Sequence, residues 1–575
     1  MVNPTFTASR RRNSRTREER TGYARSVRSL ALLGLAAVAA CGFRSPSAGT
    51  DGSVMIDAPP PPPVTEVHFV DVVSTQPTLR PGLYGFEIRA VLRNELSAPI
   101  TGIRASLTFQ DATGDRAGDF RWRDADARDG VMAAQPTSIP AGGEATFSFR
   151  VDALPFAARP GPILVNGEAT FQLDGKARSA TPLDPAASLP LAAPTPIVVN
   201  YATDEDDTDT QISLREAIKL ANANPGPDRI TFSPTVFPPG SPVTSTIANG
   251  LNEFPAVNGD LVIDGSGAGF VLAVNSSWRG SQRYGLRLTT GTLVVHDLTF
   301  RDLGEGYPLE DLTASDCGTN MVLNGGAIRT DGGTLILDGN RFSDTGVAER
   351  NCYAASIRLE GGTDHRILNN TWTDQSMDAV FLNAGMREMS GNVMVAGADV
   401  GKTDDCLVIG SQRGLDVWFI GNLCADQEFN GILATSTDTG TLHVVNNTFV
   451  RMQAGDAVHR VGARPIDLHN NAYRSNQVAA ILTDTTGAGL KISHEAEFGN
   501  AAFCTGCTGA MIQTGTMLMG ADLGFTNTAG STFADFTPVA GSLLIDSGTD
   551  LVDRNGSAPG RFNGAGPERG AVELP

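Results

Sequence analysis

The C-terminal part of the chain, from residue 228 on, consists of short apolar runs separated by Gly, Asn and Asp, and one amphipathic helix is predicted just before it. From Leu214 apolar residues recur at positions i, i+3, i+4 and i+7. Ser213 is suited to be the N-cap, with Glu216 three residues later, and Pro225 follows as a stop. The pattern predicts a helix over residues 213–223. We expect its apolar face to cover one end of the β array that follows.

A short sequence motif recurs along this β array, for example Leu-Asp-Gly-Asn-Arg-Phe ending at residue 342 and Val-Val-Asn-Asn-Thr-Phe ending at residue 449. Alignment of these motifs gives one column of asparagines: Asn340, Asn370, Asn392, Asn422, Asn447 and Asn471. Two residues further on lies a bulky column: Phe342, Trp372, Met394, Cys424, Phe449 and Tyr473. Successive asparagines are 30, 22, 30, 25 and 24 residues apart. That period is typical of the coils of a parallel β-helix.

The two columns suit such coils physically. Asparagine tolerates the left-handed backbone of a sharp turn, and stacked asparagines can form hydrogen bonds from coil to coil. The bulky column follows at period two, so its side chains are predicted to point into the bore, stacked at the ~4.8 Å spacing of parallel strands. We therefore interpret the asparagines as structural.

A separate β unit is predicted between residues 65 and 190. Runs such as Tyr84 to Leu92 and Ala145 to Val151 alternate apolar and polar residues and are separated by turn residues. The length and spacing favour an immunoglobulin-like β-sandwich. It shows no metal or nucleophile pattern, so a spacer is favoured over a binding module. A linker rich in Ala and Pro, residues 186–196, leads to the second unit.

Composition and charge narrow the function classes. The 575 residues include 64 Gly and only 12 Met, which favours a turn-dense, all-β protein. Residues 1–40 contain eight Arg and two Glu, a net of +6, which leaves −25 on the remainder of a chain whose total is −19. Such a surface repels nucleic acid and anionic lipid, so neither is expected as a partner.

The N-terminus has the features of an export signal. Arginines precede the apolar run from Leu30 to Ala40, which is well below the ~20 residues of a membrane span. Val38-Ala-Ala-Cys41 resembles the lipobox of bacterial lipoproteins, which implies cleavage before a lipidated Cys41. Gly42, rather than Asp, follows; in enterobacteria this permits transfer to the outer membrane. Residues 41–64, with five consecutive prolines, predict a semi-rigid tether. A monomer attached to the cell envelope by its lipid alone is expected.

The run Ser213-Leu-Arg-Glu-Ala217 resembles the motif named for Cys-Ser-Leu-Arg-Glu-Ala, with Ile212 in place of the Cys. In bacterial secreted proteins this motif precedes right-handed parallel β-helices. The resemblance implies an all-β chain in which residues 197–575 form a right-handed, pectate-lyase-like parallel β-helix. The C-terminal stretch, which resembles the end segments of such proteins, is expected to close the other end. Within it Asp546, Asp553 and Asn555 are either a Ca²⁺ site or a plain turn network.

Six cysteines follow Cys41, and an even number in an exported chain predicts disulfides. Proximity in sequence favours three pairs: Cys317 with Cys352, Cys406 with Cys424, and Cys504 with Cys507. The seven scattered His do not complete a zinc site with these cysteines.

The candidate for chemistry is a third column, made of Asp378, Asp405, Asn430 and Asp456, with spacings of 27, 25 and 26 residues. If the coil register holds, neighbouring members lie about one strand spacing apart and next-but-one members about 10 Å apart. Two carboxyl groups at roughly 5–10 Å are what glycosidic bond cleavage requires. Proximity of like charges would raise one pKa, which suits that group to donate a proton.

The stretch Thr403-Asp-Asp-Cys406 resembles the Gly-Asp-Asp-Cys motif of polygalacturonases, which are β-helix hydrolases acting on pectin. The resemblance implies catalytic roles for Asp404 and Asp405, with Asp378 as a further candidate. It covers about one coil, because the family's Asn-Thr-Asp, His-Gly and Arg-Ile-Lys motifs are not matched in full. A polysaccharide lyase is the other enzymatic alternative; it would need a base such as Lys402, Arg460 or Arg464.

Two hypotheses follow. The first is a lipid-anchored surface protein whose β-helix is a rigid binding or structural module that contacts polysaccharide or other cell-surface material. The second is a polysaccharide-degrading enzyme that uses Asp404, Asp405 and Asp378. The incomplete catalytic set favours the first hypothesis.

Overall fold

A computed structural model describes residues 66–572, except for the segments 75–77, 81–82, 112–113, 116–119, 123–126, 129–130, 133–135, 154–162, 184–185, 190–195, 208, 225–227, 248–253, 275–282, 304–324, 344, 346, 350–351, 376–377, 397–404, 411–413, 436, 477, 485–486, 514–515, 521 and 550–566. The expected signal peptide, the lipidation site Cys41 and the tether therefore lie outside the described residues. No helix among the described residues is long and apolar enough to cross a membrane.

Residues 67–189 form two antiparallel sheets that share one core. The first sheet contains β1 (Val67–Ser74), β2 (Thr78–Arg80), β3 (Leu83–Asn94), β6 (Phe120–Trp122) and β10 (Glu144–Ala153). The second contains β4 (Ile100–Asp111), β5 (Gly114–Asp115), β9 (Ser138–Ile139), β11 (Ile163–Leu173), β12 (Lys176–Ser179) and β13 (Ala187–Leu189). A short pair, β7 (Ala127–Arg128) and β8 (Val131–Met132), is separate. Phe147 of the first sheet and Phe109 of the second are both buried in this core, so the alternating pattern predicted here does bury one face of each sheet.

Three long parallel sheets make up the second region. Sheet I, with twelve strands, contains β14 (Pro196–Val199), β15 (Asp228–Phe232), β17 (Leu261–Asp264), β20 (Thr292–His296), β23 (Thr334–Asp338), β28 (His365–Leu368), β31 (Met386–Ser390), β34 (Val417–Ile420), β37 (Leu442–Val445), β40 (Ile466–His469), β43 (Leu490–Ser493) and β46 (Met511–Ile512). Sheet II, with eleven, contains β16 (Val243–Ile247), β18 (Phe270–Val274), β21 (Thr299–Arg301), β24 (Arg341–Ser343), β29 (Thr371–Gln375), β32 (Val393–Ala396), β35 (Leu423–Ala425), β38 (Thr448–Val450), β41 (Ala472–Arg474), β44 (Ala496–Phe498) and β47 (Leu518–Met519). Sheet III, with nine, contains β19 (Arg283–Leu288), β22 (Gly325–Asp331), β27 (Ile357–Gly361), β30 (Val380–Leu382), β33 (Leu407–Ile409), β36 (Ile432–Ala434), β39 (Val458–Arg460), β42 (Ile481–Thr483) and β45 (Cys504–Thr505). An antiparallel pair, β25 (Val347–Glu349) and β26 (Cys352–Ala354), is inserted in one coil.

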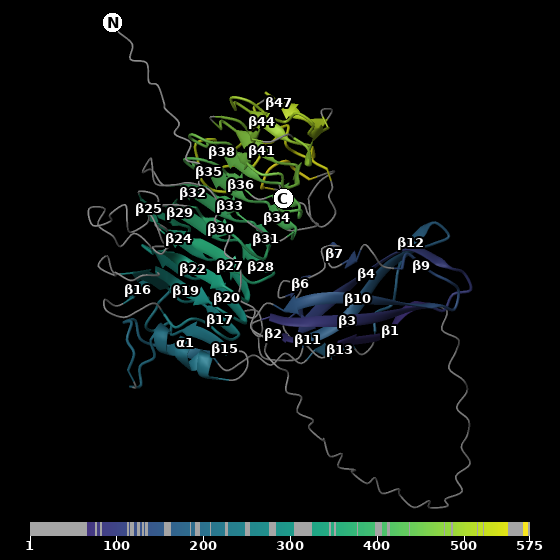
Figure 1. The fold of residues 1–575 in the computed structure, drawn as a ribbon. Coiled ribbons are helices and arrows are strands. Elements are labelled where there is room, and N and C mark those ends of the chain that lie inside the picture. The colour runs from purple at the N-terminus through teal and green to yellow at the C-terminus, as the bar shows by residue number, and fades with distance from the viewer. Residues whose placement is uncertain are drawn as a thin grey trace, which may run out of the picture. The chain divides into compact units, whose positions relative to one another are not determined.

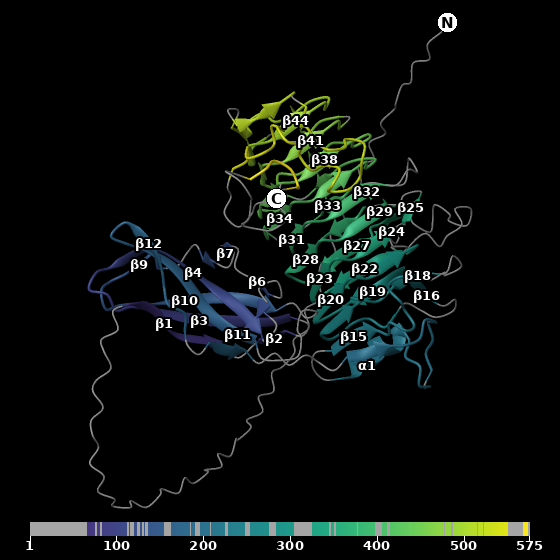
Figure 2. The same ribbon diagram turned by 180° about the vertical axis from the view of Figure 1, so that it is seen from behind.

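The chain visits the three sheets in turn, so it coils. From β17 to β47 the strands enter sheets I, II and III in order, apart from the inserted pair, and each strand pairs in parallel with its equivalent one coil away. Figure 1 shows the strands stacked between α1 at one end and β47 at the other, and Figure 2 shows the same stack from behind. This arrangement is compatible with a parallel β-helix solenoid, as the repeat period predicts.

The predicted helix is present as α1 (Leu214–Ala223). The Ser213 side chain accepts a hydrogen bond from the backbone of Glu216, and the Glu216 side chain accepts one from the backbone of Ser213. This reciprocal capping box satisfies two backbone donors at the start of the helix. Leu214 and Ile218 on its apolar face are buried in the same core as Ile230 of β15. The helix therefore covers the first coils, as expected.

The six asparagines of the repeat form one continuous ladder, all with 0% exposure. The Asn340 side-chain oxygen accepts from the Leu298 backbone at 3.0 Å. From Asn370 on, each side-chain oxygen accepts from the backbone and side-chain nitrogens of the preceding asparagine at 2.8–3.1 Å: Asn340 donates to Asn370, Asn370 to Asn392, Asn392 to Asn422, Asn422 to Asn447 and Asn447 to Asn471.

The left-handed turn conformation expected of the ladder residues is found one position earlier. Gly339 has φ 71°, Asn369 has φ 55° and Asn446 has φ 54°, and the same holds before the other three ladder positions. Two successive residues have different roles at the turn between sheets I and II. The residue before each ladder asparagine reverses the chain direction and must tolerate positive φ. The ladder asparagine that follows points inward and forms hydrogen bonds along the coil axis.

The bulky column lies inside the coils, as predicted. Its members are at most 1% exposed. Phe300, Phe342 and Trp372 stack in parallel with ring centroids 5.0 and 4.7 Å apart, and Phe449 stacks on Tyr473 at 5.6 Å. These separations are near the spacing of adjacent strands, so each coil contributes one ring to a shared stack.

The C-terminal stretch was expected to close the far end of the array, and part of it, residues 550–566, lies outside the described residues. Residues 522–549, here called the C-terminal strap, lie along the outer side of sheet II. Leu523, Phe525 and Phe536 of the strap share a buried cluster with Val450 and Ala472. Phe503 and Ile512 of the last coils instead pack against the end of the inner core. The outer residues of sheet II are apolar near its C-terminal end, so burying them against the strap is the favourable arrangement.

Two of the three expected disulfides are present in the described part of the chain. Cys406 is bonded to Cys424 with Cα atoms 6.3 Å apart, and Cys504 is bonded to Cys507 at 6.0 Å. The side chains of Cys317 and Cys352 lie outside the described residues. The Cys406–Cys424 bond links the start of β33 to β35 in the interior of the coil.

Candidate functional site

The third sequence column is aligned on sheet III. Val380, Leu407, Ile432 and Val458 are register partners on β30, β33, β36 and β39. Asp378, Asp405, Asn430 and Asp456 each lie two residues before one of these partners, so they form one file, here called the acidic column. The prediction that these four residues occupy equivalent positions in successive coils is therefore confirmed. They are 4, 2, 7 and 2% exposed, however, so the column lies beneath the surface.

The side chains of the acidic column hold neighbouring coils together. The Asp405 backbone N–H donates to Asp378 Oδ1 at 3.3 Å, Asn430 N–H donates to Asp405 Oδ1 at 2.6 Å, and Asp456 N–H donates to Asn430 Oδ1 at 3.1 Å. The pattern is that of the asparagine ladder, with carboxylates as acceptors. An oxygen committed to a buried backbone donor is poorly placed to deliver a proton to, or attack, a sugar.

The end of the acidic column meets a histidine. His459 Nδ1 lies 3.6 Å from Asp456 Oδ2, and His459 Nε2 lies 3.4 Å from Asp484 Oδ2. Burial raises the pKa of Asp456, and the imidazole of His459 opposes that effect. The His459 imidazole thus lies between two carboxylates, those of Asp456 and Asp484.

The proposed lyase bases have structural partners or lie outside the described part. Arg460 Nε donates to the backbone oxygen of Arg464 at 2.8 Å, and Arg464 donates to that of Leu415 at 2.8 Å. Both arginines are at most 1% exposed, and burial lowers the pKa of each. Lys402 and the candidate Asp404 fall in the segment 397–404, outside the described residues.

A groove of about 790 Å³ lies on the outer side of sheet II, where the C-terminal strap overhangs the strands. Its floor is formed by β29 and β32, and its far wall by strap residues. It is lined by Thr371, Thr373, Asp374, Val393, Val395, Ala396, Asp426, Gln453, Ala529, Ser531, Thr532, Phe533 and Ala534. The volume is within the range of about 300–1,000 Å³ typical of small-molecule sites.

The strap is held over this groove by one arginine of the coil. Arg451 forms a bidentate pair with Asp426, both N–O distances being 2.6 Å. The same guanidinium donates to the backbone oxygens of Thr528 and, at 2.8 Å, Gly530. One planar group therefore neutralises the groove carboxylate Asp426 and fixes the strap, which is the geometry that suits Arg.

The overhanging turn is organised by Asp535. Its carboxylate accepts from the Thr532 hydroxyl at 2.6 Å, the Thr532 backbone at 2.9 Å and the Ser531 backbone at 3.1 Å. Asn527 donates to the other carboxylate oxygen at 2.9 Å. Hydrogen bonds from Thr532 and Asn527 lower the pKa of Asp535. The rim of the groove is thus built by specific contacts.

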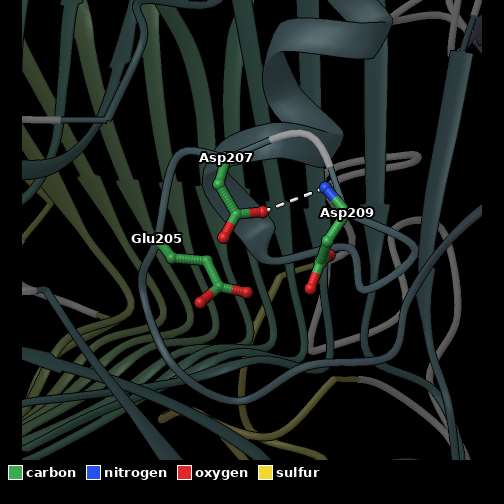
Figure 3. A group of neighbouring side chains, drawn as sticks. All are labelled: Glu205, Asp207 and Asp209. Atoms are coloured by element: carbon green, nitrogen blue, oxygen red, sulfur yellow. Dashed lines mark hydrogen bonds between the residues drawn. The ribbon is translucent and has the colours of Figure 1, made fainter.

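A second polar cluster precedes α1 (Figure 3). Carboxylate oxygens of Glu205, Asp207 and Asp209 lie within 4.8 Å of one another. The Asp209 backbone donates to Asp207 at 3.1 Å, so the loop curls around these groups. Partial burial and the neighbouring carboxylates raise the pKa of Glu205. An all-oxygen set of this kind suits a hard cation such as Ca²⁺, and no signal in the sequence analysis had singled it out.

The Ca²⁺ site proposed at the C-terminus is only partly described. Asp546 has φ 51°, a conformation common for Asp in tight turns. Asp553 and Asn555 fall in the segment 550–566, outside the described residues. The plain turn at Asp546 agrees with either interpretation of that loop.

The groove was not predicted, although one signal for it exists in the sequence. Outward positions of a solvent-facing strand should be polar, yet Leu423, Val450 and Ala472 are apolar at such positions. Once the register is known, these apolar residues indicate that another segment packs on the outer side of sheet II. The outward residues of β29 that line the groove, Thr371 and Thr373, are polar instead.

Three comparisons with known proteins add no further assignment. No protein-family model, no curated protein and no solved structure matches this chain.

Proposed function

We propose that this chain is an exported, lipid-anchored protein of the bacterial cell envelope that contacts polysaccharide without cleaving it. In this proposal the coiled region is a right-handed, pectate-lyase-like β-helix with a cap of the Cys-Ser-Leu-Arg-Glu-Ala type, carried on an immunoglobulin-like sandwich. Support comes from the lipobox-like residues up to Cys41, the proline-rich tether and the coil-by-coil pairing of the three sheets.

The observation that carries the non-catalytic part of the proposal is the state of the acidic column. Asp378 and Asp405 are buried, and each accepts a backbone hydrogen bond from the next coil. A retaining or inverting glycosidase needs two carboxyl groups that face the sugar on either side of the scissile bond. In the described residues, these carboxylates stabilise the fold.

We expect the full chain, purified in detergent, to bind polysaccharides or cell-wall fractions without releasing sugar. Retention on insoluble polysaccharide measures binding; new reducing ends and ultraviolet absorbance of unsaturated products measure hydrolysis and lyase activity. The Asp405→Asn variant should bind as well as the wild type, because its amide oxygen still accepts from Asn430 N–H. Sugar release that is abolished by Asp405→Asn would establish the polygalacturonase-like alternative and refute this proposal.

The lipid anchor is tested separately. In a bacterial host that processes lipoproteins, the Cys41→Ser variant should lose incorporation of labelled fatty acid and move from the membrane to the soluble fraction. The loss should be nearly complete, because one thiol carries the anchor. Ser47→Ala, a small change in the tether, is the matched control and should stay in the membrane. Equal fatty-acid labelling of the Cys41→Ser variant would contradict the anchor.

A further inference from the structure

We propose that the groove between β29, β32 and the C-terminal strap binds an uncharged oligosaccharide segment. This inference rests on the proposed contact with polysaccharide and assigns it a location and a ligand class. The location is the outer side of sheet II, away from the acidic column, which belongs to sheet III.

The lining combines an apolar surface with hydroxyl groups at its edges. Val393 and Val395 point outward from β32, and the half-buried ring of Phe533 faces the groove from the strap. Thr371 and Thr373 on β29, with Ser531 and Thr532 on the strap, add hydroxyls on two sides. A free hydroxyl both donates and accepts, as sugar hydroxyls do, whereas Thr532 already donates its hydrogen to Asp535 and can only accept from a ligand. The C–H faces of a sugar ring suit an apolar floor. The two surfaces together match a chain of sugar rings.

Charge decides which class of oligosaccharide fits. No Lys or Arg is among the lining residues of the groove, all of which are described. The lining carboxylate Asp426 is already neutralised by Arg451, whereas Asp374 is exposed and forms no ion pair with a described residue. The groove therefore carries one uncompensated negative charge. A polyuronate or a phosphorylated glycan would place its own anions beside Asp374 with no cation to receive them. Neutral sugars incur no such cost.

The groove is formed before any ligand arrives. Arg451 ties the strap to the coil, and Asp535 holds Ser531 and Thr532 in place on the rim. Groups already held in the binding geometry lose little conformational freedom on binding, which favours affinity. The rim hydroxyls are thus presented by a fixed turn rather than by a free tail.

The test is calorimetric titration of the full chain in detergent with neutral oligosaccharides (cello-, xylo-, malto- and chito-oligosaccharides) and with oligogalacturonate of the same length. We expect at least one neutral series to bind and oligogalacturonate not to bind. Thr373→Trp, which fills the groove from an exposed position, should weaken binding at least roughly tenfold. Thr246→Trp is the matched control, because Thr246 is in the same outward column four coils earlier and does not line the groove. It should leave affinity unchanged.

Two further readouts locate the ligand and test the charge argument. Hydrogen exchange of residues 528–535 should slow on adding the oligosaccharide that binds. Asp374→Asn, which keeps a residue that tolerates φ 50°, should gain affinity for oligogalacturonate and leave neutral binding within about twofold. Thermal unfolding of Thr373→Trp checks that the variant is folded.

The outcomes separate this inference from the proposed function. Neutral binding that Thr373→Trp leaves intact would overturn the groove assignment while polysaccharide contact stands. Binding of oligogalacturonate in preference to the neutral series would overturn the ligand class. Retention on whole polysaccharide with no oligosaccharide binding would also overturn the inference alone. Absence of binding in both assays would remove the proposed function together with it.

Discussion

Replacement of Asn422 by alanine should lower the free energy of unfolding by about 3 kcal/mol, a large effect for one polar side chain. Asn422 is in the middle of the asparagine ladder, with 0% exposure. Its Oδ1 accepts from the backbone and side chain of Asn392 at 3.0 and 2.9 Å, and its Nδ2 donates to Met389 O and Asn447 Oδ1 at 2.9 and 3.1 Å. The variant leaves several of these groups buried without a partner and opens a small cavity, and water cannot replace the lost bonds easily.

Chemical denaturation followed by circular dichroism measures this loss. Asn258→Ala is the matched control, because Asn258 is exposed in the same coiled region and its side chain forms no hydrogen bond with a described residue. That variant should stay within about 0.5 kcal/mol of the wild type. Equal stability of Asn422→Ala and Asn258→Ala would show that the ladder does not stabilise the coils.

Replacement of Glu495 by glutamine should stabilise the protein at neutral pH by up to about 3 kcal/mol. Glu495 occupies the next ladder position after Asn471, whose Nδ2 donates to its Oε1 at 3.2 Å. It is fully buried, and burial raises its pKa to about 8, an effect that Tyr473, Asn471 and Arg569 offset only in part. Glutamine preserves the shape and the acceptor oxygen but has no proton to lose, so it should extend the ladder by one uncharged amide.

The pH dependence gives this prediction a distinct signature. Between the ordinary value near 4.5 and about 8, the unfolded chain has released the Glu495 proton while the folded chain still holds it. The folded state then binds more protons, so the free energy of unfolding falls as pH rises through this window, by up to about 1.4 kcal/mol per pH unit, and levels off above it. The advantage of Glu495→Gln over wild type should therefore be small at pH 4 and largest near pH 8.

Denaturant midpoints of wild type and Glu495→Gln across this pH range check the expectation. Glu168→Gln, at an exposed carboxylate of β11, controls for the loss of one negative charge. A difference between wild type and Glu495→Gln that does not change with pH would contradict a buried, protonated Glu495.

The asparagine ladder and the acidic column form the same kind of hydrogen bond with different residues. In a parallel coil each inward or edge position meets its equivalent one strand spacing away, so a side-chain oxygen can accept the backbone N–H of the neighbouring coil at every step. Asn does this between sheets I and II, and Asp378, Asp405 and Asn430 do it at the start of the strands of sheet III. A column of acids is therefore weak support for catalysis until its exposure is known.

Repetition in the sequence was enough to determine the coil and much of its interior. The asparagine period sets which residues become neighbours, and the bulky residue two positions later must share the inward face, because side chains alternate along a strand. The stack from Phe300 to Trp372 and the helix α1 follow from such local patterns. The grouping of Asp378, Asp405 and Asp456 could be predicted for the same reason, since equal spacing becomes equal register.

Only the tertiary structure decided which of these residues face solvent and where a ligand has room. Spacing does not distinguish a carboxylate that faces a groove from one that accepts a backbone bond beneath the surface, and Asp405 is of the second kind. The path of the C-terminal strap was equally hidden, because it depends on contacts such as Arg451 with Gly530, 79 residues apart and outside any repeat. A repeat specifies the contacts of each coil with the next. The C-terminal strap is outside the repeat, so its contacts depend on the coil surface against which it packs. Those contacts form the groove.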